Sequence, residues 1–227
     1  MLWHEQFIQI AESRLASPIA GLTAVLFAGS VQARHHHPHN SGPFDYYLLS
    51  LSWAPTYGLT HADDGAECSG KGYGFVLHGL WPQYDGGGYP ENCSTQSDLS
   101  SEAIAKGRTI YPSERLMQHE RREHGTCSGL DALSHFNTAD RATAVVKIPA
   151  ATEAPKAEQS LPADQIAALF LSANPQLPQG ALTVSCNRDQ LSEIRACLTK
   201  DLPLRSCGRD VRSNCPHVPL RVPASRS

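Results

Sequence analysis

The sequence lacks the strong charge of one sign that is typical of proteins held to nucleic acid by bulk electrostatics. Its 227 residues include 19 Lys or Arg and 22 Asp or Glu, which gives a formal net charge of −3 at pH 7. Charged residues make up only 18% of the chain and hydrophobic residues 41%. This composition excludes a histone-like polycation and a disordered chain. With 17 Gly and 16 Pro, many turns are expected rather than a helical bundle.

Motifs of several enzyme classes are also absent. The chain has no C-x-x-C pair, which argues against zinc ribbons and thioredoxin-like redox centres. It has neither a G-x-S-x-G elbow nor a P-loop. Beyond residue 33, no apolar run reaches the about 20 residues that cross a membrane.

The N-terminus has the pattern of an export signal. Residues 15–30 carry no charge, and Val31-Gln32-Ala33 has the small residues of a cleavage site, so we expect residues 1–33 to be removed. A membrane anchor is disfavoured because the uncharged run is short and contains Pro18. Export predicts a periplasmic or secreted protein. A flexible segment is expected at 34–43, where His35-His36-His37-Pro38-His39 would bind metal weakly or incidentally.

Seven cysteines on an exported chain predict a disulfide framework with one thiol left over. They are Cys68, Cys93, Cys127, Cys186, Cys197, Cys207 and Cys215. Charge is uneven along the chain, because residues 188–227 hold eight basic and four acidic side chains. We expect a basic tail at 217–227, which would attract phosphate or simply aid solubility.

The mixed order of strand and helix signals favours one α+β domain with a mainly antiparallel sheet and packed helices. Strands are expected over 45–53, 73–80, 182–186 and 191–198, the last two as a hairpin. One helix is expected to begin at Ser113 and end at Gly125, and another to span 165–173. Loops are expected over 56–72, 85–89 and 149–162.

Two segments concentrate side chains that move protons near neutral pH. His78-Gly79-Leu80-Trp81-Pro82 ends a strand, and His119, Glu120 and His124 lie at the end of a helix. His119 and His124 are five residues apart, about 140° on a helix, so they converge poorly on one zinc ion. Glu120 and His124 are four residues apart and are expected to share a helix face.

These two segments resemble the active-site segments of the ribonuclease T2 family. His78-Gly79-Leu80-Trp81-Pro82 and the pattern from His119-Glu120 to His124-Gly125-Thr126-Cys127 match in order and separation. Leu51-Ser52-Trp53-Ala54-Pro55 resembles the family's first core strand, and the cysteine-bearing end from Val184 to Cys215 also fits. The likeness covers Phe44 to Cys215, and we expect the family-like domain to span 44–216. The resemblance implies an α+β fold and cleavage of single-stranded RNA with no metal or other cofactor.

The chemistry implied by the resemblance is transphosphorylation to a 2′,3′-cyclic phosphate, then hydrolysis to a 3′-phosphate. DNA lacks the 2′-OH and would not be cut. His78 and His124 would be the acid–base pair; the sequence leaves their order open, with His124 favoured as the base. His119 would hold the phosphate, and Glu120 would lie near the transition state. Unperturbed pKa values of about 6.5 predict a bell-shaped profile centred on mildly acidic pH.

The resemblance extends to base stacking and disulfides. Trp81 and Tyr89 lie where the family stacks a base, which suits low specificity, although core packing is an alternative for Trp81. The implied pairs are Cys93–Cys127, Cys186–Cys215 and Cys197–Cys207. Cys68 would be the free thiol, because Gly58 stands where many members carry its partner.

Two further positions depart from the family pattern. Arg121 replaces the usual Trp of the second segment, and Glu123 occupies the position of a Lys that faces the phosphorane. At about 4 Å and an effective dielectric of about 20, a charge interaction is roughly 4 kcal/mol, so the reversed sign at Glu123 is expected to matter. Arg121 and Arg122 are the candidates to restore the positive charge, and Arg122 is the one we assign to substrate binding.

Three hypotheses follow from these residues. The first is an exported, monomeric endoribonuclease that acts on single-stranded RNA. The second is a catalytically weakened family member that binds RNA or a protein partner, motivated by Glu123. The third is a periplasmic metal-binding protein that uses its His-rich N-terminal segment.

Overall fold

The computed structural model describes residues 43–61, 64–68 and 71–225. The expected signal at 1–33 and nearly all of the His-rich segment lie outside the described residues, as does the side chain of Cys68. The elements in chain order are β1 (Tyr46–Trp53), α1 (Ala54–Thr60), α2 (Gly65–Cys68), β2 (Phe75–Gln83), α3 (Ser101–Ile110), α4 (Glu114–Glu123), η1 (Gly125–Ser128), α5 (Ala132–Val145), η2 (Ala150–Thr152), β3 (Gln159–Leu161), α6 (Ala163–Ala173), β4 (Leu182–Asn187), β5 (Gln190–Leu198) and β6 (Leu220–Val222).

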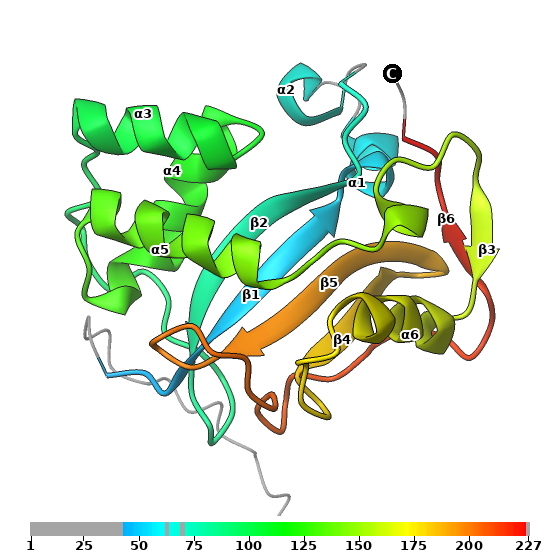
Figure 1. Cartoon of the computed structure of the whole chain (residues 1–227). Helices are drawn as coiled ribbons and strands as arrows, with labels where there is room; N and C mark the ends of the chain where they lie inside the picture. Colours follow the sequence, from blue (N-terminus) through cyan, green and yellow to red (C-terminus); the bar gives the residue numbers. More distant parts are fainter. Residues whose placement is uncertain (1–42, 62–63, 69–70, 226–227) are drawn as a thin grey trace, which may run out of the picture. The chain divides into compact units, whose positions relative to one another are not determined.

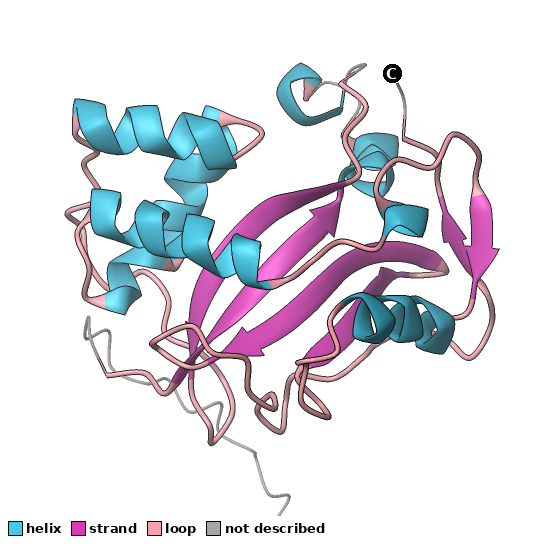
Figure 2. Cartoon of the chain, in the orientation of Figure 1, coloured by secondary structure: helices cyan, strands magenta, loops and turns pink. Residues whose placement is uncertain are grey.

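One sheet organises the described residues (Figures 1 and 2). Its strands lie in the order β2-β1-β5-β6-β3, and β4 pairs with β5. The pairs β1–β2, β1–β5, β4–β5 and β3–β6 are antiparallel, whereas β6 meets β5 in one parallel pair. The α+β class with a mainly antiparallel sheet is therefore confirmed. In the part of the chain that the structure describes, no helix combines the length and apolar character needed to span a bilayer.

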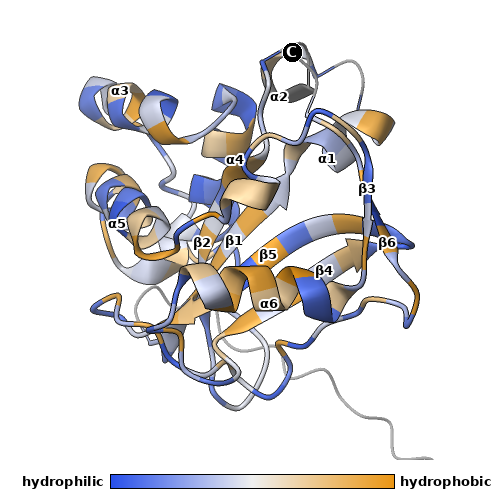
Figure 3. Ribbon diagram, turned by 45° about the vertical axis from the view of Figure 1, so that its right-hand side comes forward, coloured by the Kyte–Doolittle hydropathy of each residue, from blue (hydrophilic) through white to orange (hydrophobic). Residues whose placement is uncertain are grey.

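Strand β1 is buried on both of its faces. Leu49 and Leu51 belong to the main core, together with Phe136 of α5 and Phe170 of α6. Both helices interleave polar and apolar residues (Figure 3), as expected for helices that bury one side. The alternate residues of β1 point the other way and form a second, smaller cluster that contains Tyr46, Leu48 and Cys197. Side chains on this second face therefore extend from a strand whose other face is packed into the main core.

The prediction of a loop over 56–72 is wrong, because α1 and α2 lie within this range. Pro55 is in the first turn of α1, where its missing N–H costs no helical hydrogen bond. The proline that ends β1 thus also starts a helix. Helices α3 and α5 went unpredicted, although Ser100 and Asp131 cap them through side-chain hydrogen bonds and are residue types that signal a helix start.

The segments expected as a basic tail at 217–227 and a loop at 149–162 contain β6 and β3, which pair with each other. Leu220 and Val222 are fully buried. The carbonyl of Pro223 accepts a hydrogen bond from Trp53 Nε1 at 3.1 Å. A three-residue strand is too short to produce a clear alternation in the sequence. The packed domain therefore continues to Pro223, past the boundary expected at 216.

Three disulfides join the pairs that the resemblance implies. Cys93–Cys127 ties the loop after β2 to η1, across a sequence separation of 34 residues. The other two tie the C-terminal segment to β4 and β5. In the chain-entropy model, closing a loop of the first size stabilises the fold by roughly 3–4 kcal/mol.

His135 of α5 is a buried titratable group in the core. It is 0% exposed, and burial lowers its pKa to about 4. Its Nε2 lies 3.4 Å from the carbonyl oxygen of Leu80, while its Nδ1 has no hydrogen-bond partner. The unfolded chain takes up a proton here below about pH 6.5, and the folded chain only near pH 4. His135 therefore removes stability as the pH falls through that window.

We expect His135→Gln to remove part of the acid sensitivity of the fold. Between pH 7 and pH 5, the free energy of unfolding of the parent should fall by about 2 kcal/mol more than that of the variant. Urea unfolding at the two pH values measures this difference, and any general effect of the substitution cancels. An equal fall in both proteins would contradict the assignment.

Candidate active site

His78 lies in a β-bulge of β2. The pairing of β1 with β2 runs from Leu51–Leu77 directly to Ser50–Gly79, so His78 is the extra residue at this step. Neighbouring side chains of a regular strand point to opposite faces, and a bulge re-aims one of them. The bulge puts His78 next to Glu193 of β5, on the second face of the sheet.

Glu120 of α4 is packed against the bulge and is 1% exposed. Its Oε2 accepts a hydrogen bond from Trp81 Nε1 at 2.6 Å, and its Oε1 lies 3.5 Å from His78 Nε2. Burial raises the pKa of Glu120 to about 7, so the side chain carries a proton at mildly acidic pH. Position 79 requires glycine, because a Cβ there would overlap both the Glu120 carboxylate and the Trp81 indole nitrogen.

The other ring nitrogen of His78 is held by β5. Its Nδ1 lies 2.7 Å from Glu193 Oε1, and Arg195 binds Glu193 Oε2 through Nε and Nη2, each at 2.7 Å. Burial of Glu193 favours a raised pKa, but the hydrogen bond with His78 and the charge of Arg195 prevail and hold the pKa at about 2. This pair was not predicted from the sequence, since alternating polar residues are ordinary in a hairpin strand.

His124, unlike His78, lies in surroundings that disfavour a positive charge on its ring. It follows α4 as its C-terminal cap, and its Nδ1 is buried without a hydrogen-bond partner. Burial, together with the positive charge of His119 and His78, lowers the pKa of His124 to about 4. Its link to Glu120 is the backbone hydrogen bond from His124 N to Glu120 O at 3.1 Å. The Glu120 carboxylate itself is turned toward Trp81 and His78, which differs from the expected partnership of the two side chains.

Trp81 lies between the two histidines. Its ring centroid is 5.1 Å from that of His78 and 5.1 Å from that of His124. The guanidinium of Arg195 lies 5.6 Å from the same ring. Tyr89, which is 50% exposed, has its ring centroid 5.9 Å from His124. The structure thus brings Trp81 and Tyr89 together at His124, as base stacking there would require.

The Gly-rich loop that carries Tyr89 is anchored to the C-terminal segment. Gly88 N donates a hydrogen bond to Asp210 Oδ2 at 2.7 Å. Asp85 forms an ion pair with Arg205 at 2.6 Å. These contacts anchor at both ends a segment that the sequence alone indicated only as a loop.

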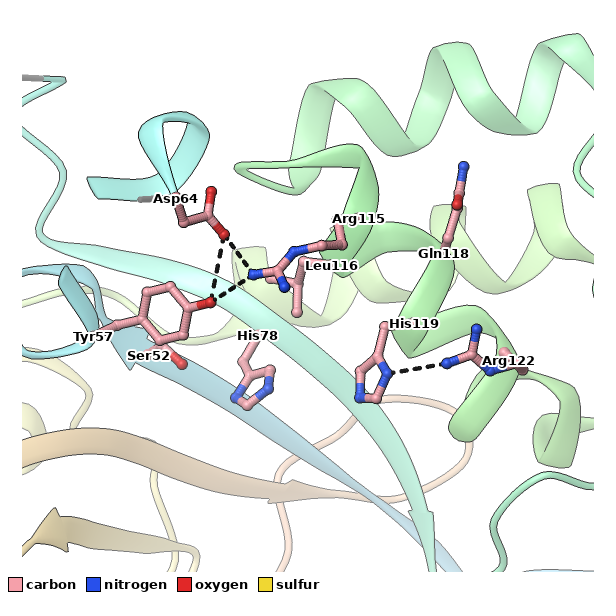
Figure 4. A pocket seen from close by; sticks show the side chains of 9 residues that line it. All are labelled: Ser52, Tyr57, Asp64, His78, Arg115, Leu116, Gln118, His119 and Arg122. Carbon is pink, nitrogen blue, oxygen red and sulfur yellow. Dashed lines mark hydrogen bonds and ion pairs between the residues drawn. The ribbon is translucent and has the colours of Figure 1, made fainter. Parts of the chain in front are cut away.

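A cleft of about 400 Å³ opens beside His78 and His119 (Figure 4). His78 comes from β2 and His119 from α4, so the cleft lies between the sheet and this helix. At its far side, Arg115 Nη2 donates to Tyr57 Oη at 3.0 Å and to Asp64 Oδ2 at 2.8 Å. The lining residues are Ser52, Tyr57, Asp64, His78, Arg115, Leu116, Gln118, His119 and Arg122.

A family model, described as the ribonuclease T2 family, matches residues 44–207. The chain belongs to this family. Among solved structures it resembles an RNase-related protein from Calystegia sepium, with a TM-score of 0.65 and 23% identity over 81% of this chain and 99% of that one. RNase NT in complex with 5′-AMP gives a TM-score of 0.62 and 21% identity over 80% of this chain and 99% of that one. At these identities, the likeness shows the fold.

Curated relatives include bacterial proteins named as ribonucleases. The chain is 44% identical over 109 residues to a ribonuclease of Aeromonas hydrophila, covering 48% of this chain and 47% of that protein. It is 28% identical over 188 residues to a probable ribonuclease of Haemophilus influenzae, covering 76% of this chain and 64% of that protein. The chain therefore spans less than two thirds of the length of either relative.

Arg121, at the position where the resemblance leads us to expect a Trp, is buried against the turn that follows α4. It is 7% exposed, and its Nη1 donates to the carbonyl oxygens of Gly125 at 2.8 Å and Leu130 at 3.0 Å. These bonds hold the turn after α4, from which His124 extends. Arg121 is bound to this turn and does not line the cleft, so it is not the source of positive charge there.

Arg122 and Glu123 form an ion pair at the edge of the cleft. Arg122 Nε lies 3.0 Å from Glu123 Oε1, and Arg122 Nη2 lies 3.4 Å from His119 Nδ1. Asn92 Nδ2 binds the other Glu123 oxygen at 2.5 Å. Burial opposes ionisation, but the hydrogen bonds from Arg122 and Asn92 lower the pKa of Glu123. The charge that departs from the family pattern is therefore ionised but partnered.

Proposed function

We propose that this protein is an endoribonuclease that cleaves single-stranded RNA by transphosphorylation without a metal. One observation carries the proposal: the two motif histidines of a ribonuclease T2 family chain flank one indole ring in opposite charge environments. Cleavage of an RNA phosphodiester near neutral pH needs one imidazole to take a proton while another gives one.

The environments favour His124 as the base and His78 as the acid. Burial keeps the imidazole of His124 neutral down to about pH 4. His78 has an ionised carboxylate, Glu193, at its Nδ1, and a nearby negative charge favours imidazolium. The site would thus hold one neutral and one protonated imidazole at the same pH. Two histidines with the same ordinary pKa would titrate together, so fewer molecules would carry this combination.

The reaction follows from these roles. His124 takes the proton of the ribose 2′-OH, and the oxygen attacks the adjacent phosphorus. The bond from phosphorus to the 5′-oxygen breaks, and that oxygen takes a proton from His78 Nε2. The product is a 2′,3′-cyclic phosphate, which water opens to a 3′-phosphate with the roles of the two histidines reversed. Glu120, protonated at mildly acidic pH, would donate a hydrogen bond toward the phosphoryl oxygens.

The surroundings supply subsites for the nucleotides on either side of the phosphate. Trp81 and Tyr89 offer π-faces that accept any base. The cleft beside His78 and His119 has room for the next nucleotide. His119 and Arg122 would bind the phosphate from the edge of that cleft. We also propose that the protein acts as a monomer in the periplasm or outside the cell, and leaves DNA intact because DNA has no 2′-OH.

The test is cleavage of a short single-stranded RNA by the purified, disulfide-bonded protein in EDTA, from pH 4 to 8. We expect cyclic-phosphate ends, and a loss of about 10²–10⁴-fold in rate for His78→Ala and for His124→Ala. His217→Ala, at an exposed position on the C-terminal segment, is the control and should match the parent.

Two outcomes would overturn the proposal. Cleavage by His78→Ala at the parent rate would remove the assigned acid. RNA binding without cleavage at any pH would favour the weakened, RNA-binding family member that Glu123 motivates.

Arg122→Ala should lower kcat/KM for RNA about 10–100-fold, because it removes the cation beside His119 and leaves Glu123 uncompensated. The matched control is Arg108→Ala, another solvent-exposed arginine paired with a glutamate, in this case Glu114 at 2.6 Å on α4. Steady-state kinetics of both variants measure the effect. Unchanged kinetics in Arg122→Ala would show that phosphate binding draws its charge from elsewhere.

A further inference from the structure

We propose that Glu193 and Arg195, on strand β5, form a positioning pair that orients His78 and keeps it protonated for its role as the acid. The inference rests on the proposed function, and it concerns two residues outside both histidine segments. They lie 115 and 117 positions from His78 in the chain, and the fold brings them to it across the sheet.

The first observation is the direction of the hydrogen bond. Glu193 is 7% exposed and, with a pKa of about 2, accepts hydrogen bonds and does not donate them. His78 Nδ1, 2.7 Å away, must then carry the proton of that bond. The proton that can be exchanged is therefore on Nε2, which faces Glu120 at 3.5 Å. Glu193 thus selects the tautomer in which His78 donates and recovers protons on the side of Glu120.

The second observation is how Glu193 itself is held. Arg195 contacts only Oε2, through two nitrogens at 2.7 Å, and this leaves Oε1 for His78. The same guanidinium lies 5.6 Å from the centre of the Trp81 ring. Arg195 therefore fixes the rotamer of Glu193 and contacts the indole whose nitrogen binds Glu120. A flexible carboxylate would lose this orientation.

The third observation is the balance of charge at His78. Ionised Glu193 favours imidazolium, whereas Arg195 lies beyond it and weakens that effect. Protonated Glu120 adds no charge at mildly acidic pH. The charged and titratable groups that face His78 or line the cleft beside it come from three elements and the segments after them. They are Glu193 and Arg195 from β5, Glu120, His119, Arg122 and Arg115 from α4, His124 after α4, Tyr57 from α1, and Asp64 after α1.

The test removes the charge of Glu193 while keeping its shape. In Glu193→Gln, the amide oxygen can still accept from His78 Nδ1, so that bond remains while the charge is lost. The amide nitrogen then lies where Oε2 was and cannot accept the two bonds from Arg195. The control is Glu158→Gln, which removes an equal charge from an exposed Glu–Arg pair, 3.0 Å from Arg221. Two readouts are needed: the titration midpoint of His78 by NMR, assigned with His78→Gln, and the pH profile of kcat/KM on RNA.

We expect the midpoint of His78 in Glu193→Gln to move about one pH unit or more to lower pH, because a neighbouring opposite charge shifts titration by that amount. The descending limb of the pH profile should move by the same amount. Relative to the parent, the rate should then fall up to about tenfold further at pH 7 than at pH 5, because the shifted midpoint matters only where His78 loses its proton. Glu158→Gln should leave both readouts unchanged.

A uniform loss of rate at every pH with an unmoved midpoint would overturn the proposal, since a merely structural residue behaves in that way. An unchanged profile would overturn it too. The NMR midpoint separates this inference from the proposed function. If the parent does not cleave RNA, the proposed function fails, while a shifted midpoint would still establish that Glu193 controls the charge of His78.

A second variant covers the case in which Glu193→Gln does not fold. Arg195→Gln keeps the carboxylate at His78 and removes the competing cation. Its His78 midpoint should move to higher pH, and its kcat should fall because Glu193 is no longer held in one orientation. A midpoint that stays in place or moves to lower pH would contradict the proposed pair.

Discussion

The hydrogen bond from the Trp81 indole to buried Glu120 is the contact on which the rest of the site depends. It joins α4 to β2 directly above Gly79, where any side chain would block it. Because the bond fixes the indole, it also fixes the distances from the ring to His78 and His124. Burying an ionised carboxylate costs free energy unless the charge is paired. The raised pKa of Glu120 indicates that burial outweighs the opposing effects of His78 and Trp81 and favours the neutral form.

The two histidines on either side of this contact lie in different surroundings. His78 is re-aimed by a bulge toward a carboxylate, and His124 is withdrawn from solvent at the end of a helix. Two groups of the same chemical type thus lie in surroundings that favour different charge states, and the proposed acid and base would be separated in this way. The carboxylate of Glu123, expected from the resemblance to reverse the charge at this position, is paired with Arg122 and Asn92.

Much of this fold and site was accessible from the sequence. Ser113 marked the start of α4, the hairpin of β4 and β5 followed from alternation, and the family resemblance pointed to the histidines and to the three disulfides now seen in the structure. The bulge at His78 was not predictable, because a register shift between strands leaves no periodic signal. Glu193 and Arg195 were missed for a related reason: a polar residue on a half-buried strand looks the same whether it meets solvent or a histidine.

The most direct test of this account is an NMR titration of the two imidazoles in the unaltered, disulfide-bonded protein. At pH 5.5 we expect His124 to be neutral and His78 to be protonated, each with its own midpoint. If the two rings titrate together near pH 6.5, or if His124 takes up its proton before His78, the fold does not separate acid from base. The assignment of roles to His78 and His124 would then be contradicted.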